Sequence, residues 1–380
     1  MASSFFSRTD TSLIGRWWWA VDRWMLLVLC MLMAIGCILS FSGTPFIAKK
    51  LGLSSFYMVE KQLLLFIPSF FLMIGVSMLP FSFVKKMSFW IFGISLFFLI
   101  LTPFWGIEIK GARRWINIMG LSLQPSEFIK PTFSIVSAWI LNYADNDAKK
   151  MSFLEISPRL FSFGLYVIII FFLLLEPDLG MTFVVSCAWG VQIFLAGLSF
   201  LWVFLIFILA TGGLFLAYFF FPHVSHRIDR FLDPDAGDRY QINHSLEAFM
   251  NGGFFGLGPG EGIVKKHLPD AHSDFIFAVA GEEFGLLFCL LIVGLYAFII
   301  FRSFSDTLKS SNYFIFLSVC GLSAQFGIQA LVNMASSLHL IPTKGMTLPF
   351  LSYGGSSLLA LSLGMGILLN FTRKRLGYSE

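Results

Sequence analysis

The chain has 380 residues, of which 57% are hydrophobic and only 13% are charged, and its mean hydropathy is +0.80. Soluble domains carry about 25% charged residues, so this composition excludes an ordinary soluble globule and makes lipid the solvent for most of the chain. A formal net charge of +4 does not favour a nucleic-acid partner, and the five cysteines all lie in apolar stretches, where cysteine acts as a small hydrophobe.

Long apolar stretches predict an all-α polytopic membrane protein with about ten transmembrane helices, because about 20 mostly apolar residues cross a bilayer. A turn at residues 197–199 would divide the 43 uncharged residues of 179–221 into two spans. An even number of spans places both termini on one side. The candidate spans are residues 24–42, 62–84, 87–107, 127–144, 160–175, two within 179–221, 275–301, 312–335 and 350–372.

The distribution of Lys and Arg sets the orientation of such a protein in the membrane. These residues divide equally, with 13 on the side of the termini and 13 opposite. Long loops count little in the positive-inside rule, and leaving out the five cations of residues 222–274 gives 13 against eight. We therefore expect cytoplasmic termini. The cations that remain in the outer loops indicate an anionic ligand on the outer face.

Residues 222–274 form the longest predicted loop, between spans seven and eight. A loop of 53 residues in a compact protein is usually functional or disordered, and the aromatic residues and glycines of this one favour a folded structure. We expect residues 1–380 to form a single transmembrane domain that carries this one large extracytoplasmic loop.

Cations cluster around the outer loop that follows the third span. Arginine and lysine at a membrane face suit a diphosphate or another anion. The alternative is that these side chains snorkel to the interface, where tryptophans anchor the helix ends. The residues concerned are Lys110, Arg113, Arg114, Trp115, Glu127 and Lys130.

Two carboxylates, Glu176 and Asp178, flank Pro177 between the fifth and sixth spans. They could bind a metal ion or brace the outer face. Because proline and aspartate are typical turn residues, the bracing interpretation is favoured.

Asp274 stands where the long loop enters the eighth span. A carboxylate at such a junction is partly desolvated, which makes it a better proton acceptor near neutral pH. If the helix begins at Asp274, Glu282 lies two turns deeper on a nearby face, whereas Glu283 faces away. The alternatives are that Asp274 caps the helix and the glutamates pair with arginines. A metal site is disfavoured because the histidines and aspartates nearby lack tight ligand spacing.

The last outer segment, residues 342–357, contains a Gly-Gly-Ser-Ser run inside an apolar stretch. Small residues permit close helix packing. The same run could instead interrupt the helix and turn backbone amides toward an anion. Packing is the favoured interpretation.

Five stretches in this order resemble the SEDS family of polytopic cell-wall polymerases. They are KGARRW with QPSEFIK at 110–130, EPDLG at 176–180, residues 230–262, LPDAHSDFIFAVAGEEFG at 268–285 and PTKGMTLPFLSYGGSS at 342–357. With the ten spans they cover nearly the whole chain. DAHSDFIFA is more similar to the FtsW branch, which acts in division, than to the RodA branch, which acts in elongation. Ser273 stands where the family commonly has threonine, so the hydroxyl is retained.

The resemblance implies a peptidoglycan glycosyltransferase that polymerises lipid II into β-1,4 glycan strands with inversion during septal wall synthesis. It also implies that Asp274 is catalytic and acts as the general base. No metal site or cofactor is expected, although the sequence does not decide whether the reaction uses a divalent cation. The predicted substrate-binding residues are Lys110, Arg113, Arg114, Trp115, Glu127, Lys130, Arg227, Lys265, Lys266, His272, Glu282, Lys344, Ser352, Gly354 and Gly355.

The resemblance further implies a location in the bacterial inner membrane at the division septum. The expected partners are lipid II, a class B penicillin-binding protein transpeptidase and other divisome membrane proteins. The alternatives are a lipid II flippase or other transporter, an elongation-type RodA polymerase, and a scaffold that only recruits the transpeptidase. A transporter needs polar residues at mid-membrane, and several of the predicted spans have uncharged cores.

Overall fold

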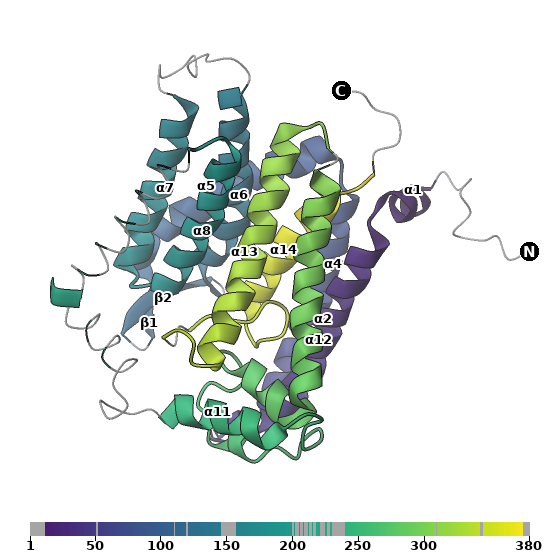
Figure 1. The fold of residues 1–380 in the computed structure, drawn as a ribbon, viewed down its shortest axis with the longest axis vertical. Helices are drawn as coiled ribbons and strands as arrows, with labels where there is room; N and C mark the ends of the chain where they lie inside the picture. The colour runs from purple at the N-terminus through teal and green to yellow at the C-terminus, as the bar shows by residue number, and fades with distance from the viewer. Residues whose placement is uncertain are drawn as a thin grey trace, which may run out of the picture.

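The computed structural model describes residues 12–50, 52–109, 111–118, 121–145, 157–199, 240–308, 310–342 and 345–374, with single positions between 201 and 229. Most of these residues are helical, which confirms the all-α polytopic fold (Figure 1). The elements are α1 (Leu13–Ala20), α2 (Arg23–Gly43), α3 (Pro45–Lys50), α4 (Tyr57–Met78), α5 (Phe81–Trp105), β1 (Ile107–Ile109), β2 (Ala112–Ile118), β3 (Leu121–Leu123), α6 (Pro125–Asp145), α7 (Pro158–Leu175), α8 (Leu179–Leu195), α11 (Tyr240–Gly252), the 3-10 helix η1 (Val264–Lys266), α12 (Ile276–Thr307), α13 (Tyr313–Ser337) and α14 (Gly355–Phe371).

Nine of the ten predicted spans are helices in the described part of the chain, namely α2, α4 to α8 and α12 to α14. The tenth, the second span predicted within 179–221, falls largely outside the described residues. Among the described helices, six are long and apolar enough to cross a membrane, and α8 and α14 are shorter apolar helices.

The boundary between the second and third spans differs from the prediction. The sequence indicated spans at 62–84 and 87–107, but α4 ends at Met78 and α5 begins at Phe81. Pro80 causes the difference, because a proline holds the preceding residue in an extended conformation and suits the start of a helix. Lys85 and Lys86, predicted to lie in the connection, therefore belong to α5.

Helix α14 lies in the centre of the bundle, and nearly all of its side chains are buried. A Cβ placed on Gly366 would lie 2.8 Å from the backbone oxygen of Met73, so glycine permits the close packing of α14 on α4. The side-chain amide of Asn370 donates to the carbonyls of Val76, Ser77 and Leu79. These bonds tie the C-terminal end of α14 to the end of α4, where helix carbonyls lack intrahelical partners.

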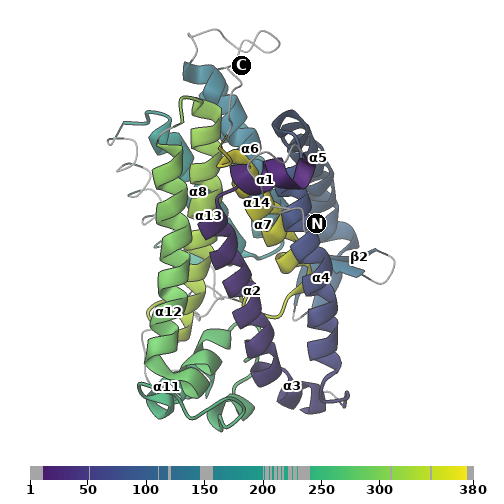
Figure 2. The same cartoon turned by 90° about the vertical axis from the view of Figure 1, so that its right-hand side faces the viewer.

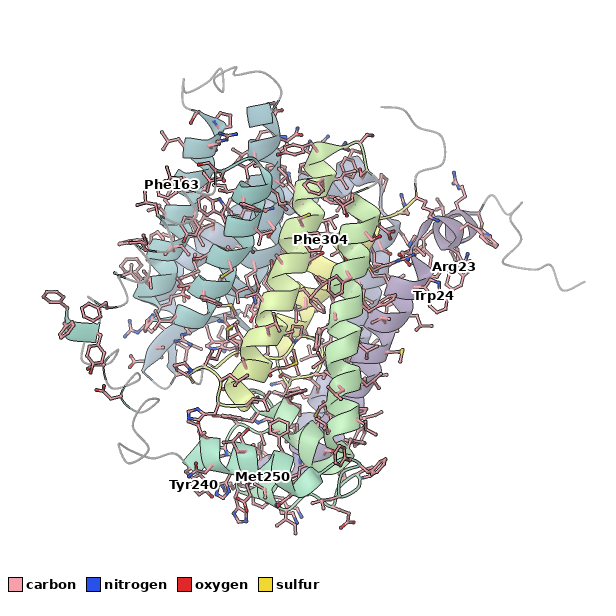
Figure 3. All side chains as sticks on the ribbon, viewed as in Figure 1. Arg23, Trp24, Phe163, Tyr240, Met250 and Phe304 are labelled. Carbon is pink, nitrogen blue, oxygen red and sulfur yellow. The ribbon has the colours of Figure 1, made fainter. Side chains whose placement is uncertain are left out.

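The bundle has two ends that differ in content. One, here called the terminal end, carries α1, the turn between α4 and α5 and the end of α14 (Figure 2). The opposite end, here called the loop end, carries α11, the antiparallel sheet β1-β2-β3 and the connection between α13 and α14 (Figure 1). Apolar side chains such as Trp24 and Phe163 point away from the helices toward lipid (Figure 3).

Helix α12 is interrupted at Gly285, where φ is 80° and ψ is −178°. The interruption leaves the carbonyls of Glu282 and Glu283 to accept the amides of Leu257 and Gly258, at 3.0 and 2.9 Å. Backbone bonds thus fix the glycine-rich end of the long loop to the break in α12. The described part of this loop is folded as the sequence indicated.

Candidate functional site

Asp274 lies at the loop end, in a turn immediately before α12. Helix α12 begins at Ile276 with Phe275 at the N-cap position, so Asp274 is not the helix cap. The carbonyl of Asp270 organises this turn by accepting the amides of Ser273 and Asp274, both at 3.0 Å. Asp270 itself has φ of 55°, a conformation that aspartate tolerates better than most residues.

The position of Glu282 corrects the prediction that it shares a pocket with Asp274. Its carboxylate accepts the amides of Ile263 and Val264 at 2.7 Å and of Lys265 at 3.0 Å. Glu283, predicted to face away, is buried and forms an ion pair with the Lys265 ammonium group. Lys265 is therefore already paired within the protein, and the two glutamates hold η1 against α12. The prediction rested on the condition that the helix begins at Asp274, whereas α12 begins at Ile276.

The connection between α13 and α14 packs directly against the turn that carries Asp274. Ser352 Oγ accepts the amide of Leu348 at 2.7 Å and donates to the carbonyl of Ser273 at 2.5 Å. The amide of Tyr353 donates to the carbonyl of His272 at 2.8 Å, and the rings of these two residues lie 5.4 Å apart. Ser352 and His272 thus hold the two segments together.

Glycines bring this connection close to the Asp274 carboxylate. A Cβ placed on Gly345 would lie 3.4 Å from Asp274 Oδ2. The apolar stretch is interrupted before α14, which begins at Gly355 after extended backbone at Gly354. A Cβ on Gly355 would lie 3.0 Å from Leu65, so the glycine pair serves close packing as well as interruption.

Two buried amides of α13, which the sequence analysis did not identify, extend the site. Asn333 Nδ2 donates to the carbonyl of Asp274 at 3.0 Å and to that of Met346 at 2.6 Å. One turn away, Gln329 Nε2 donates to the carbonyl of Thr347 at 3.0 Å. The signal in the sequence was the presence of buried-type polar residues at a spacing of four within an apolar span.

Gln329 also connects the site to the predicted pair Glu127 and Lys130. Lys130 Nζ donates to Gln329 Oε1 at 2.7 Å and lies 2.7 Å from Glu127 Oε2. Both charged side chains are almost completely buried. The burial of both groups excludes snorkelling to the interface for this pair, because a snorkelling side chain places its charged group in water.

Arg114, on β2, braces the turn between α7 and α8. Its guanidinium group donates to the carbonyls of Glu176 at 3.0 Å and Pro177 at 2.5 Å and lies 3.8 Å from Asp178. Asp178 in turn accepts the amide of Met181 and caps α8. The bracing interpretation of Glu176 and Asp178 agrees with this geometry.

Burial raises the pKa of Glu176 to about 9, and the negative charge of Asp178 adds to the rise. The stabilising effect of a raised pKa is complete below the ordinary value of 4.5 and is lost as the pH rises through about 9. Glu176→Gln removes this titration, so the variant should gain thermal stability relative to the wild type as pH rises across that interval. Melting temperatures of the purified protein at several pH values test this, and a constant difference would contradict it.

The remaining predicted residues differ in accessibility. Arg113 is 49% exposed and lies 3.4 Å from the exposed Glu108, whereas Trp115 is half-buried in β2 opposite Ile107. Lys266 is exposed on η1. Lys110, Arg227 and Lys344 lie outside the described residues. No group of three or more His, Cys, Asp or Glu side chains is arranged to hold a metal ion among the residues that the structure describes.

Met346 joins the two halves of the site. Its carbonyl is held by Asn333 beside Asp274, and a Cβ on Gly180 would lie 2.8 Å from its sulfur. The connection between α13 and α14 therefore reaches from Asp274 to the turn that Arg114 braces. The described parts of all five sequence stretches meet at the loop end.

A family model described as "Cell cycle protein" and labelled for FtsW, RodA and SpoVE matches residues 22–376. The chain belongs to this FtsW/RodA/SpoVE family. Two relatives carry the name "Probable peptidoglycan glycosyltransferase FtsW". The Caulobacter vibrioides protein is 39% identical over 99% of this chain and 95% of its own length. The Coxiella burnetii protein is 34% identical over 92% of this chain and 96% of its own length.

Solved structures of the FtsW/RodA/SpoVE family have the same fold. A chain from a peptidoglycan synthase complex that coordinates polymerization and crosslinking superposes with a TM-score of 0.78 at 25% identity, covering 93% of this chain and 98% of its own. The rod shape determining protein RodA of Thermus thermophilus superposes with a TM-score of 0.67 at 24% identity, covering 93% of this chain and 97% of its own.

Proposed function

We propose that this chain is a peptidoglycan glycosyltransferase of the FtsW type, which polymerises lipid II into β-1,4 glycan strands during septal wall synthesis. The observation that supports it best is the position of Asp274, fixed through its carbonyl by Asn333 and packed beside the connection between α13 and α14. The names of the FtsW relatives agree with this activity.

Asp274 acts as the general base in the proposed reaction. It takes the proton of the acceptor 4-hydroxyl while the hydroxyl oxygen bonds to the anomeric carbon of the donor. The bond from that carbon to the diphosphate breaks, and its electron pair leaves with the undecaprenyl diphosphate. A single displacement converts the α-linked donor into a β-1,4 product. The reaction includes no cofactor. Polymerisation assays with EDTA and with added Mg²⁺ test this.

Cations at the loop end neutralise the departing diphosphate in this proposal. Lys130, Lys265 and Arg114 are paired or hydrogen-bonded within the protein, so they shape the site rather than meet the diphosphate. Among the described cations that were predicted to bind substrate, Arg113 and Lys266 are exposed and can reach it, together with Lys110 and Lys344 from the sequence.

Arg113→Gln should weaken lipid II binding by about tenfold, the usual effect of losing a charge-assisted contact. It should leave the melting temperature unchanged, because an exposed ion pair contributes little. Arg114→Gln should lower both the affinity for lipid II and the melting temperature, since it removes the brace on residues 176–178. The matched control is Lys49→Gln, which changes another exposed cation of the loop end. Lipid II binding in nanodiscs measures the effect, and an unchanged affinity for Arg113→Gln would favour the snorkelling interpretation.

The protein is proposed to lie in the bacterial inner membrane at the septum, with the loop end outside and a class B penicillin-binding protein transpeptidase as its partner. The solved synthase complex, which coordinates polymerization and crosslinking, supports a crosslinking partner. Other divisome membrane proteins are also expected to bind.

Cysteine labelling tests the orientation. Glu261 is exposed at the loop end and Ser311 is exposed at the terminal end. In a variant whose native cysteines are replaced, Glu261→Cys should react with a membrane-impermeant maleimide in intact spheroplasts, and Ser311→Cys should react only after lysis. The reverse pattern would place the termini outside.

A further inference from the structure

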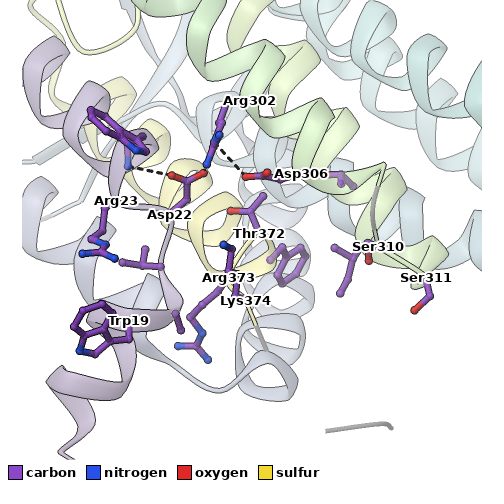
Figure 4. Close-up of a pocket in the computed structure, with 16 residues that line it drawn as sticks. Trp19, Asp22, Arg23, Arg302, Asp306, Ser310, Ser311, Thr372, Arg373 and Lys374 are labelled. Atoms are coloured by element: carbon purple, nitrogen blue, oxygen red, sulfur yellow. Dashed lines mark hydrogen bonds and ion pairs between the residues drawn. The ribbon is translucent and has the colours of Figure 1, made fainter. Parts of the chain in front are cut away.

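The terminal end, opposite the end that carries Asp274, contains a cavity of about 750 Å³ (Figure 4). Its walls come from the turn between α1 and α2, the end of α12, the connection to α13 and the end of α14. Hydroxyl groups of Ser310, Ser311 and Thr372 line part of it. Nothing in the proposed polymerisation requires this cavity.

Charges along the cavity wall favour an anion. Arg302 is matched by two carboxylates, Asp22 at 2.6 Å and Asp306 at 3.5 Å (Figure 4). Burial raises the pKa of Asp22, but hydrogen bonds lower it below the ordinary value, and the bond from Arg302 has the largest effect among them. Asp22 therefore stays charged. The described lining residues also include Arg23 and two cations of the end of α14, which give the wall a formal net charge of +2.

The position of the cavity corresponds to the depth of lipid headgroups. Helix α1 lies across the terminal end of the bundle (Figure 2) and exposes Leu13 by 75% and Ile14 by 60%. One turn further along the same face the helix is anchored to the bundle, since the indole N–H of Trp17 donates to Ser77 Oγ at 3.0 Å. Such a helix lies in the membrane interface with its apolar face toward the acyl chains.

A tryptophan and an arginine beside the cavity also indicate the depth of the lipid headgroups. Trp24, which lines the cavity, is 63% exposed, and tryptophan is enriched where headgroups meet hydrocarbon. The guanidinium group of Arg23 lies 4.8 Å from the ring centroid of Trp19, which keeps this cation beside the cavity opening.

We propose that this cavity binds the phosphate headgroup of an anionic phospholipid from the leaflet at the terminal end. Arg23 and Lys374 contact the phosphate, and the hydroxyl groups of the wall contact the glycerol part. Arg373 donates to the carbonyls of Ser77 and Met78 and adds its charge to the wall. The acyl chains lie against the apolar face of α1 and Trp24. Inorganic phosphate would meet the same cations, but it gains nothing from the exposed apolar side chains, which favours the lipid.

Native mass spectrometry of the detergent-solubilised protein titrated with phosphatidylglycerol or phosphatidylcholine tests the proposal. The wild type should bind the first phosphatidylglycerol more tightly than phosphatidylcholine. Arg23→Gln with Lys374→Gln should weaken that binding by about 25-fold, since each cation near an anionic lipid contributes about fivefold. Arg23→Lys with Lys374→Arg retains both charges and should bind as the wild type does, which separates charge loss from misfolding.

Three results would overturn the proposal. The first is equal affinity for the two lipids, and the second is displacement of phosphatidylglycerol by millimolar inorganic phosphate, which would assign the cavity to a free anion. The third comes from the control Lys85→Gln with Lys86→Gln, which removes two cations of the same end outside the cavity. If that control lost as much affinity for phosphatidylglycerol as Arg23→Gln with Lys374→Gln, the basic end would attract anionic lipid without a defined site.

Discussion

Asp274→Asn should abolish detectable glycan polymerisation, because loss of a general base lowers a reaction rate by about 10²- to 10⁴-fold. Asparagine keeps the size of the side chain and leaves the backbone bonds of the turn unchanged, but it cannot accept the proton. Expression, lipid II binding and partner association should therefore persist. The measurement is gel analysis of the glycan products formed from lipid II with the crosslinking partner present.

Asp270→Asn is the matched control for this experiment. It changes a carboxylate of the same turn, and asparagine also tolerates the positive φ found there. Polymer should form with this variant. Polymer from Asp274→Asn would remove that residue as the base, whereas no polymer from the wild type would remove the glycosyltransferase proposal and leave the transporter and the scaffold.

Asn333→Leu should lower kcat by about 10- to 100-fold, because a small displacement of a catalytic group has effects of that size. The change keeps the branched shape of a side chain that is 1% exposed but removes its bonds to the carbonyls of Asp274 and Met346. Asn333 is a positioning residue, so KM for lipid II should change much less than kcat. Initial rates over a range of lipid II concentrations separate the two constants.

Gln325→Leu is the control for the second experiment. It removes another buried amide of α13, two turns from Asn333, and should leave kcat unchanged. Asn333→Asp, which also lacks the amide donor, should behave as Asn333→Leu does. Equal losses of activity in Asn333→Leu and Gln325→Leu, with matching falls in melting temperature, would show that α13 tolerates no change rather than that Asn333 positions Asp274.

The spans could be predicted from the sequence because crossing a bilayer requires length and apolarity, both of which are local properties. The position of Asp274 at the junction of a loop and a span was also predictable, since the apolar stretch begins directly after it. The hydrogen-bond partners of Glu282 could not be predicted. The position of the Glu282 carboxylate depends on a helix that starts at Ile276. Its partners are amides of residues 263–265, which only the folded loop brings close to it.

Arg114 and Asn333 show a second limit of the sequence. Arg114 was expected to meet an anion, and its main partners are backbone carbonyls of a turn more than 60 residues away. Asn333 bonds to carbonyls as well. Every residue has a carbonyl, so a side-chain pattern cannot reveal which ones a distant donor will reach.

The break at Gly285 divides α12 into two rods with different attachments. The short rod, residues 276–284, is fastened to the folded loop and follows directly after Asp274, whereas the long rod, residues 286–307, runs through the bilayer. A helix bends readily where its ladder of hydrogen bonds is interrupted. Here, however, the amides of Leu286 and Leu287 donate to the carbonyls of Gly253 and Phe254, so the folded loop is bonded to α12 on both sides of the break. We therefore expect the loop to hold the angle between the two rods, and with it the place of the carboxylate, when the bilayer thickness changes.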